Sequence, residues 1–196
     1  MKIFRGFEEI DRLEKPVVAI GSFDGVHLGH CRILRYLCDT ARQCGGQSVV
    51  VTFDPHPQQL LNPDSDFFTI NPIEDNLKRI AEQGVDAAVV IPFTRSFSEI
   101  SYLEFIEQYI IGRLHAQTLV MGPNHALGHN REGDRAKIEA VCVQHNVTVV
   151  DIPEFLYNNA KVHSSNIRKL IQRKDFEKVN ELLGYPYKSK NQINNN

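Results

Sequence analysis

The chain has 196 residues, 42% of them hydrophobic, which suits one globular domain with a core of its own. Its 24 acidic and 22 basic side chains give a formal net charge of -2, which excludes a broad positive field for nucleic acid. No stretch is apolar for long enough to cross a bilayer, and the charged N-terminus does not resemble a secretory signal. The four cysteines lack the spacing of a disulfide scaffold, so we expect a cytoplasmic protein.

Short β-branched runs alternate along the chain with stretches of helical periodicity. The runs are residues 17–20, 48–53, 87–91, 118–121 and 147–150. The helical stretches are residues 30–44, 73–83, 102–113, 135–145, 164–173 and 175–183. Strands that are apolar on both faces are typical of a parallel sheet covered by helices. The alternation therefore predicts a doubly wound α/β sheet whose ligands lie at the carboxyl ends of the strands.

A glycine-bearing loop, GSFDGVHLGH, joins the first strand to the first helix. Such a turn offers backbone N–H groups and the positive end of a helix to a phosphate. His27 and His30 are three residues apart, so both imidazoles can face one side, and Gly29 between them leaves room for a ligand. Two donors on one side of a phosphate suit phosphoryl-type transfer. A helix-start feature and a divalent metal site are the alternatives.

A second candidate segment, TFDPHP, follows the second strand at the place where a second substrate would lie. Pro55 and Pro57 flank His56 and fix φ on both sides of it, so the loop has one shape. An ordinary rigid turn is the alternative interpretation of these residues on their own.

A third candidate segment, HSSNIR, lies near the end of the chain. Ser164 and Ser165 open a helix and cap its N–H groups, and Arg168 lies on the same helical face. An arginine at this position presents a planar, permanently charged fork to phosphate oxygens. A capped surface helix with a solvated arginine is the alternative.

Taken together, these segments resemble the HxGH nucleotidylyltransferases in the form carried by prokaryotic FAD synthetases, the adenylyltransferase half of bifunctional riboflavin kinase/FAD synthetases. The resemblance covers about residues 17–187 and implies a Rossmann-like sheet of the HxGH type. It also implies transfer of AMP from ATP to FMN, which gives FAD and pyrophosphate, with Mg²⁺ accompanying ATP and no metal ligand from the protein. We expect one catalytic domain at residues 1–187, a disordered polar tail at residues 188–196, and no kinase activity.

The resemblance implies roles for individual residues. Those expected to act in catalysis are His27, His30, Ser165 and Arg168. Those expected to bind ATP are Gly21, Ser22, Phe23, Asp24, Gly25, Gly29 and Ser164. Those expected to bind FMN are Asp54, His56, Pro57 and Asn124.

The sequence also departs from the family pattern. Ala126 and Leu127 stand where similar proteins usually have Arg, or another polar residue, and Phe, and His163 replaces the first serine of the ISSTxIR motif. Two other functions therefore remain open. The chain could be a nucleotidylyltransferase for another phosphorylated acceptor, such as pantetheine phosphate or nicotinamide mononucleotide, or a non-catalytic flavin or nucleotide sensor.

Overall fold

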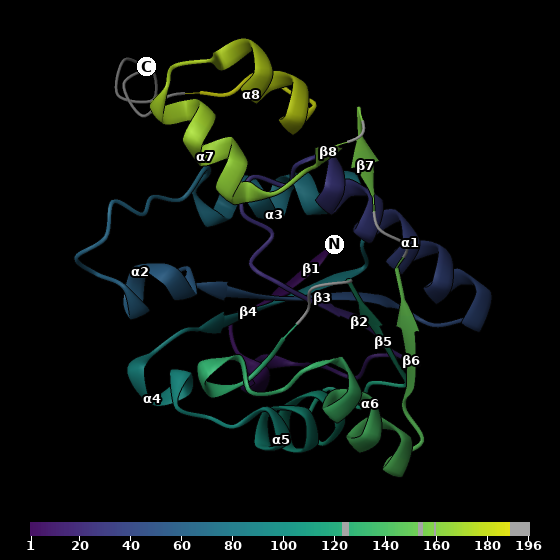
Figure 1. Cartoon of the computed structure of the whole chain (residues 1–196). Helices are drawn as coiled ribbons and strands as arrows, with labels where there is room; N and C mark the ends of the chain where they lie inside the picture. The colour runs from purple at the N-terminus through teal and green to yellow at the C-terminus, as the bar shows by residue number, and fades with distance from the viewer. Residues whose placement is uncertain (123–125, 153–154, 159, 189–196) are drawn as a thin grey trace.

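A six-stranded parallel sheet forms the centre of the computed structural model, which describes residues 1–122, 126–152, 155–158 and 160–188 (Figure 1). Its strands are β1 (Lys2–Phe4), β2 (Val17–Ile20), β3 (Ser48–Asp54), β4 (Ala87–Pro92), β5 (Thr118–Met121) and β6 (Thr148–Asp151). Every pair of neighbours is parallel, in the order β1-β4-β3-β2-β5-β6. The predicted doubly wound sheet is confirmed.

The sheet is buried on both faces because successive residues of each strand point to opposite sides. In β2, Val17 and Ala19 join the core cluster that contains Leu34 of α1, whereas Val18 and Ile20 join the cluster that contains Ile106. All four β2 residues are at most 5% exposed. This burial on both faces explains why the strands are continuous apolar runs in the sequence.

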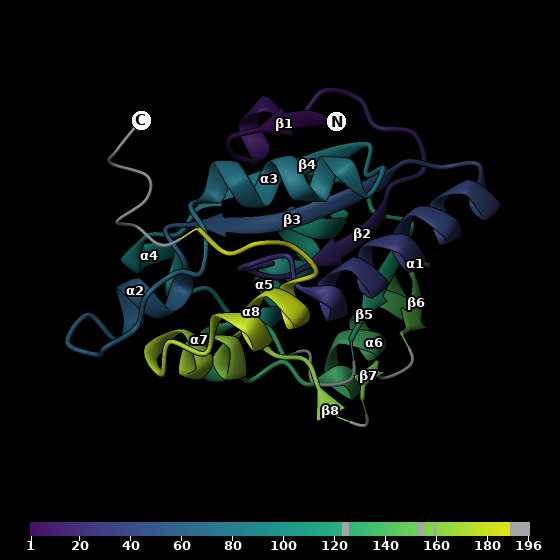
Figure 2. The same ribbon diagram turned by 90° about the horizontal axis from the view of Figure 1, so that it is seen from above.

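Helices cover both faces of the sheet, with α1 and α3 on one side and α4, α5 and α6 on the other (Figures 1 and 2). The α-helices are α1 (Leu28–Cys44), α2 (Pro57–Leu61), α3 (Ile73–Glu82), α4 (Arg95–Ser98), α5 (Tyr102–Glu104), α6 (Arg135–Gln144), α7 (Ser164–Gln172) and α8 (Phe176–Leu183). Short 3₁₀ turns span Phe7–Glu9 and His129–Arg131, and β7 (Leu156–Tyr157) pairs with β8 (Ala160–Lys161) in an antiparallel hairpin. Within the described ranges, no helix is long and apolar enough to span a membrane.

The main difference from the predicted elements is at residues 102–113. The chain forms the single turn of α5 there and continues as a π-helix, Phe105–Ile111, in place of one regular helix. Wide turns of this kind are rare and have no sequence signature. By contrast, α1 ends as predicted, because Gly45 adopts a left-handed φ of 61° and caps it.

Helices α7 and α8 lie beside α1 and α3, on the same side of the sheet (Figures 1 and 2). Their apolar faces form a separate small core in which Ile167, Val179 and Leu183 pack with Ile70 and Val162. Because Ile70 comes from the segment that precedes α3, this core fixes the last helices against the first half of the chain. The N-terminus of α7 is thereby held near the loop that follows β2.

The packing of α1 predicts a clear difference between two Leu→Ala substitutions. Leu34 is fully buried in the core under α1, so Leu34→Ala should lower the free energy of unfolding by about 2–5 kcal/mol through lost contacts and a residual cavity. Leu103 is 42% exposed, so Leu103→Ala should change it by no more than about 0.5 kcal/mol. Urea denaturation measures both values. Equal losses in the two variants would contradict the described packing.

Candidate active site

The loop between β2 and α1 lies where the strand order reverses, because β2 has β3 on one side and β5 on the other. Ligands of doubly wound sheets bind at such a point. The protein itself uses part of the loop's hydrogen-bonding capacity. The N–H of Gly21 donates to Val51 O at 3.0 Å, and the N–H of Gly25 donates to Asn76 Oδ1 at 3.1 Å. The expectation that this turn offers free N–H groups is therefore wrong at Gly21 and Gly25.

His27 caps the N-terminus of α1, and its Nδ1 accepts the N–H of His30 at 3.2 Å. Because Nδ1 is the acceptor, the proton of the neutral ring lies on Nε2. The two imidazoles are stacked, with ring centroids 3.7 Å apart and planes 14° apart. The predicted pair thus forms one compact unit, beside a glycine whose added Cβ would lie 3.1 Å from the His27 ring.

Both imidazoles are held in the neutral state. Burial, helped by the neighbouring His163 and Arg168 side chains, lowers the pKa of His27 to about 3. Burial, helped by His27 and His163, lowers the pKa of His30 well below its usual value. Near pH 7 the two neutral rings can therefore form hydrogen bonds with a ligand without adding positive charge to the site.

Arg168 of α7 reaches the same loop. Its Nη2 forms a 2.8 Å ion pair with Asp24 Oδ2, and its Nε donates to Phe68 O at 2.8 Å. Ser164, at the start of α7, donates its hydroxyl to Asp24 O at 2.9 Å. The structure therefore brings the end of the chain to the first loop, close enough for the Arg168 charge to act on His27. Ser165, on the same turn, is exposed.

Asp24 is buried, with only 2% of its side chain exposed. Besides Arg168, its carboxylate accepts the N–H groups of Ile70 at 2.9 Å and of Asn71 at 3.3 Å. Phe23 is also buried and packs its ring 5.2 Å from that of His30. Contacts of Asp24 and Phe23 with ATP stay predictions.

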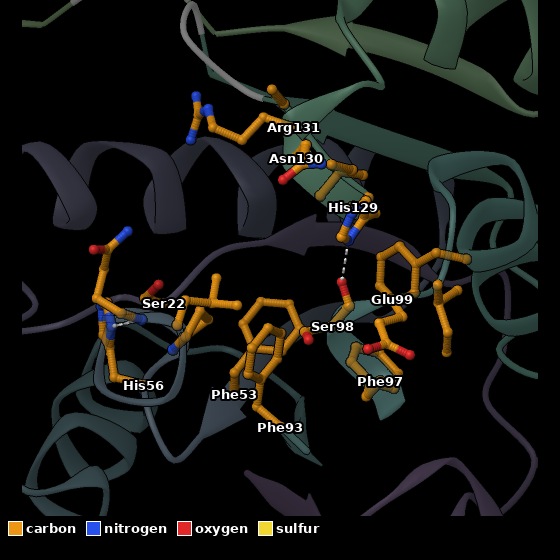
Figure 3. A pocket seen from close by; sticks show the side chains of 18 of the residues that line it. Ser22, Phe53, His56, Phe93, Phe97, Ser98, Glu99, His129, Asn130 and Arg131 are labelled. Carbon is orange, nitrogen blue, oxygen red and sulfur yellow. Dashed lines mark hydrogen bonds between the residues drawn. The ribbon is translucent and has the colours of Figure 1, made fainter. Parts of the chain in front are cut away.

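A cavity of about 900 Å³ opens at the carboxyl ends of β2, β3 and β4. One side of it is an aromatic wall formed by Phe53, Phe93 and Phe97, with ring centroids 5.6–6.4 Å apart (Figure 3). Phe93 meets the other two rings edge to face, and those two rings are tilted relative to each other. Gly21 and Ser22 also line the cavity, so the loop after β2 borders both the cavity and the histidine pair. The polar groups that line it are Ser22, His56, Gln58, Asn62, Arg95, Ser98, Glu99, His129, Asn130 and Arg131.

Two of the predicted FMN contacts, His56 and Pro57, line this cavity. His56 caps α2 through Nδ1, which accepts the N–H of Gln58 at 3.1 Å, and burial lowers its pKa to about 4. Asp54 ends β3 and is exposed, but it is not one of the lining residues in the part of the chain that the structure describes. Asn124 lies outside the described residues.

The loop before α6 contributes Ala126 and Leu127 to the cavity. Leu127 is only 8% exposed and pairs with Gly133. Gly128 and Gly133 are required here, because a Cβ at either would lie 2.3 Å from an atom of Tyr102. The close approach of this loop to α5 therefore explains why both positions are glycine.

Sequence reasoning missed several residues of the site. Phe97 and His129 line the cavity, and Phe67 contacts Arg168 with 4.3 Å between the guanidinium carbon and the ring centroid. Phe97 lies in a single-turn helix, and the sequence signal for that helix is its capping residue, Thr94. Phe67 lies between α2 and α3 with no motif around it.

Metal binding by the protein has no support in the described ranges, where no group of three His, Cys, Asp or Glu side chains could hold an ion.

Known proteins resemble this chain over most of its length. The profile of the FAD synthetase family matches residues 9–166. A bifunctional riboflavin kinase/FMN adenylyltransferase from Listeria monocytogenes is 37% identical over 90% of this chain, which corresponds to 56% of that protein. The chain therefore spans little more than half the length of this curated relative.

Two solved structures share the fold. A crystal structure described as a macrolide-efflux protein from Streptococcus pneumoniae has a TM-score of 0.79 and 24% identity, covering 94% of this chain and 70% of that one. A pantothenate synthetase from Thermus thermophilus has a TM-score of 0.54 and 15% identity, covering 93% and 71%. At these identities the likeness supports the fold alone. Because the family profile spans well over half of its residues, the chain belongs to the FAD synthetase family.

Proposed function

We propose that this chain is an FMN adenylyltransferase, which transfers AMP from ATP to FMN and gives FAD and pyrophosphate. One observation carries the proposal: in a member of the FAD synthetase family, the cavity and the His27–His30 pair share the loop after β2. A flavin ring and a triphosphate bound at these two places would meet at that loop. The proposed catalytic domain is residues 1–187.

The cavity suits the isoalloxazine ring of FMN. Phe53, Phe93 and Phe97 offer an apolar aromatic wall, against which a planar ring can pack face to face or edge to face. His56 and Ser22 lie at one end of this wall, toward the loop after β2 (Figure 3). The phosphate of FMN would extend toward that end, where the adenylyl group is transferred.

The triphosphate of ATP would lie among His27, His30, Ser165 and Arg168. Arg168 is already anchored, because Nε and Nη2 are bonded to Phe68 O and Asp24. Within the described ranges its Nη1 has no hydrogen-bond partner, so this half of the fork can donate to phosphate oxygens. An anchored guanidinium loses little freedom on binding, which favours its use in positioning ATP.

The reaction needs no base from the protein. An oxygen of the FMN phosphate attacks the α-phosphorus of ATP and forms the new P–O bond. The bond from the α-phosphorus to the bridging oxygen of the β-phosphate breaks, and that oxygen leaves with the electron pair as part of pyrophosphate. Because the attacking phosphate is ionised near neutral pH, catalysis is mainly positioning and electrostatic stabilisation. The neutral imidazoles and Arg168 would donate hydrogen bonds to the charge that develops.

Mg²⁺ would enter with ATP as part of the substrate, since this ion usually binds phosphate oxygens and keeps few protein ligands. The side chains proposed to hold the triphosphate carry imidazole, hydroxyl and guanidinium groups, which agrees with an ion bound mainly by phosphate oxygens. A cytoplasmic location is supported by Cys31, Cys38, Cys44 and Cys142, all of which are free thiols.

The direct test is to incubate the purified chain with ATP, Mg²⁺ and FMN and to measure FAD and pyrophosphate by chromatography. We expect both products in equal amounts. Parallel reactions contain pantetheine phosphate or nicotinamide mononucleotide in place of FMN. Product from one of these acceptors and none from FMN would refute the proposed acceptor, and ATP binding with no product in any reaction would favour a sensor.

Substitution of His30 tests the role of the imidazole pair. His30→Ala should lower the turnover number about a hundredfold or more, because a preorganised donor to the developing charge is lost. His145→Ala, at the far end of α6 and outside the cavity lining, serves as the matched control. An unchanged turnover number in a folded His30→Ala protein would contradict the assignment.

The neutral state of His27 predicts acid sensitivity. Its pKa falls from 6.5 in the unfolded chain to about 3 in the folded protein, so the unfolded chain binds more protons at pH values in between. The free energy of unfolding should therefore decrease as pH falls below 6.5, with up to about 1.4 kcal/mol per pH unit due to this residue. His27→Gln should flatten the slope measured by urea denaturation between pH 6.5 and 4.5. A slope in the His27→Gln protein equal to that of the unchanged protein would refute the prediction.

A further inference from the structure

The segment between α2 and α3 places an aromatic ring against the arginine of the proposed ATP site. The guanidinium carbon of Arg168 lies over the ring of Phe67, 4.3 Å from its centroid. We propose that Phe67 is a positioning residue, whose ring holds Arg168 in the orientation that binds the phosphates of ATP. This inference rests on the proposed function only in taking Arg168 as a ligand of those phosphates.

Three contacts together hold the Arg168 side chain, which is 15% exposed. Hydrogen bonds to Phe68 O and to Asp24 Oδ2, both 2.8 Å, fix two of its nitrogens. The Phe67 ring contacts the central carbon and so restrains the group in a direction that these hydrogen bonds do not control. Without the ring, the guanidinium could turn about its two anchored nitrogens, and Nη1 would no longer point in one direction.

The ring itself is held in place from the other substrate site. Its centroid is 4.6 Å from that of His56, with the planes at 36°. His56 is in turn fixed as the capping residue of α2, through its bonds with Gln58 and Gln59. Phe67 thus lies between a residue that lines the cavity and the arginine of the ATP site, and both neighbours restrict its movement.

The contact requires an aromatic residue if positioning is its role. A cation over the face of a ring is attracted by the ring's quadrupole, which an aliphatic side chain of similar size lacks. Leucine at position 67 would fill much of the same space without that attraction. A purely structural role in packing this segment would be met by leucine, so the two roles can be separated.

The test measures the affinity of the full chain for ATP with Mg²⁺ by calorimetry, without FMN. Phe67→Leu should weaken binding about three- to tenfold, the range expected for loss of a cation–π contact at a partly exposed site. Phe67→Tyr, which keeps the ring, should bind within about twofold of the unchanged protein. Phe68→Leu, which keeps the backbone carbonyl that Arg168 contacts, measures the general cost of altering this segment. Equal weakening by Phe67→Leu and Phe67→Tyr, or by Phe67→Leu and Phe68→Leu, would overturn the proposal.

A double-mutant cycle tests whether Phe67 acts through Arg168. Arg168→Gln removes the cation and keeps a hydrogen-bond donor for the buried Asp24. In that background Phe67→Leu should cause no further loss of ATP affinity. A further loss as large as in the unchanged protein would show that Phe67 acts independently of Arg168. Phe67→Met takes the place of the leucine variant if circular dichroism shows that the latter is unfolded.

These measurements separate this inference from the proposed reaction. If the chain binds ATP but makes no FAD, the adenylyltransferase function fails while the Phe67 prediction can still hold. If FAD is made and neither Arg168→Gln nor Phe67→Leu weakens ATP binding, the role of Phe67 fails while the function stands.

Discussion

The organisation of the site depends on the buried carboxylate of Asp24 and its ion pair with Arg168. A charge with 2% exposure is costly unless it is paired and fully hydrogen-bonded, and here Arg168 and the N–H groups of Ile70 and Asn71 meet that requirement. The donors come from two segments, one before α3 and one in α7, and the acceptor comes from the loop after β2. Loss of any of these donors would leave the buried carboxylate with too few hydrogen bonds, so the three segments are held in one arrangement.

This arrangement separates the positive charge of the site from its neutral hydrogen-bond donors. The Arg168 guanidinium forms an ion pair with Asp24, and burial, helped by His163 and Arg168, lowers the pKa of His27 and keeps its ring neutral. Two charged imidazoles stacked 3.7 Å apart would repel each other, which the depressed pKa values of His27 and His30 avoid. A triphosphate would therefore meet one fixed cation and two uncharged donors, all positioned before it binds.

The sequence predicts the sheet well and the contacts of the site only in part. Strands such as β2 and β5 have the predicted bounds, because burial on both faces leaves an unbroken apolar run. The three-residue β1, the π-helix at Phe105–Ile111 and the contact of Phe67 with Arg168 could not be predicted. Strand β1 is too short for a pattern, and the last contact joins segments that only the tertiary fold brings together.

Ala126 and Leu127 depart from the family pattern and line the cavity, so their effect can be judged from the other residues that line it. Leu127 is buried, whereas the aromatic wall comes from Phe53 and Phe93 at the ends of β3 and β4, and from Phe97 of α4, so a flavin ring keeps a surface to stack on. Polar groups also remain, since His129, Asn130 and Arg131 line the cavity from the same loop, opposite that wall (Figure 3). Asn130 and Arg131 have φ values of 51° and 58°, a conformation that costs free energy and is concentrated at ligand sites. The loop that carries Ala126 and Leu127 thus still presents polar side chains to the cavity, which supports the proposed flavin acceptor.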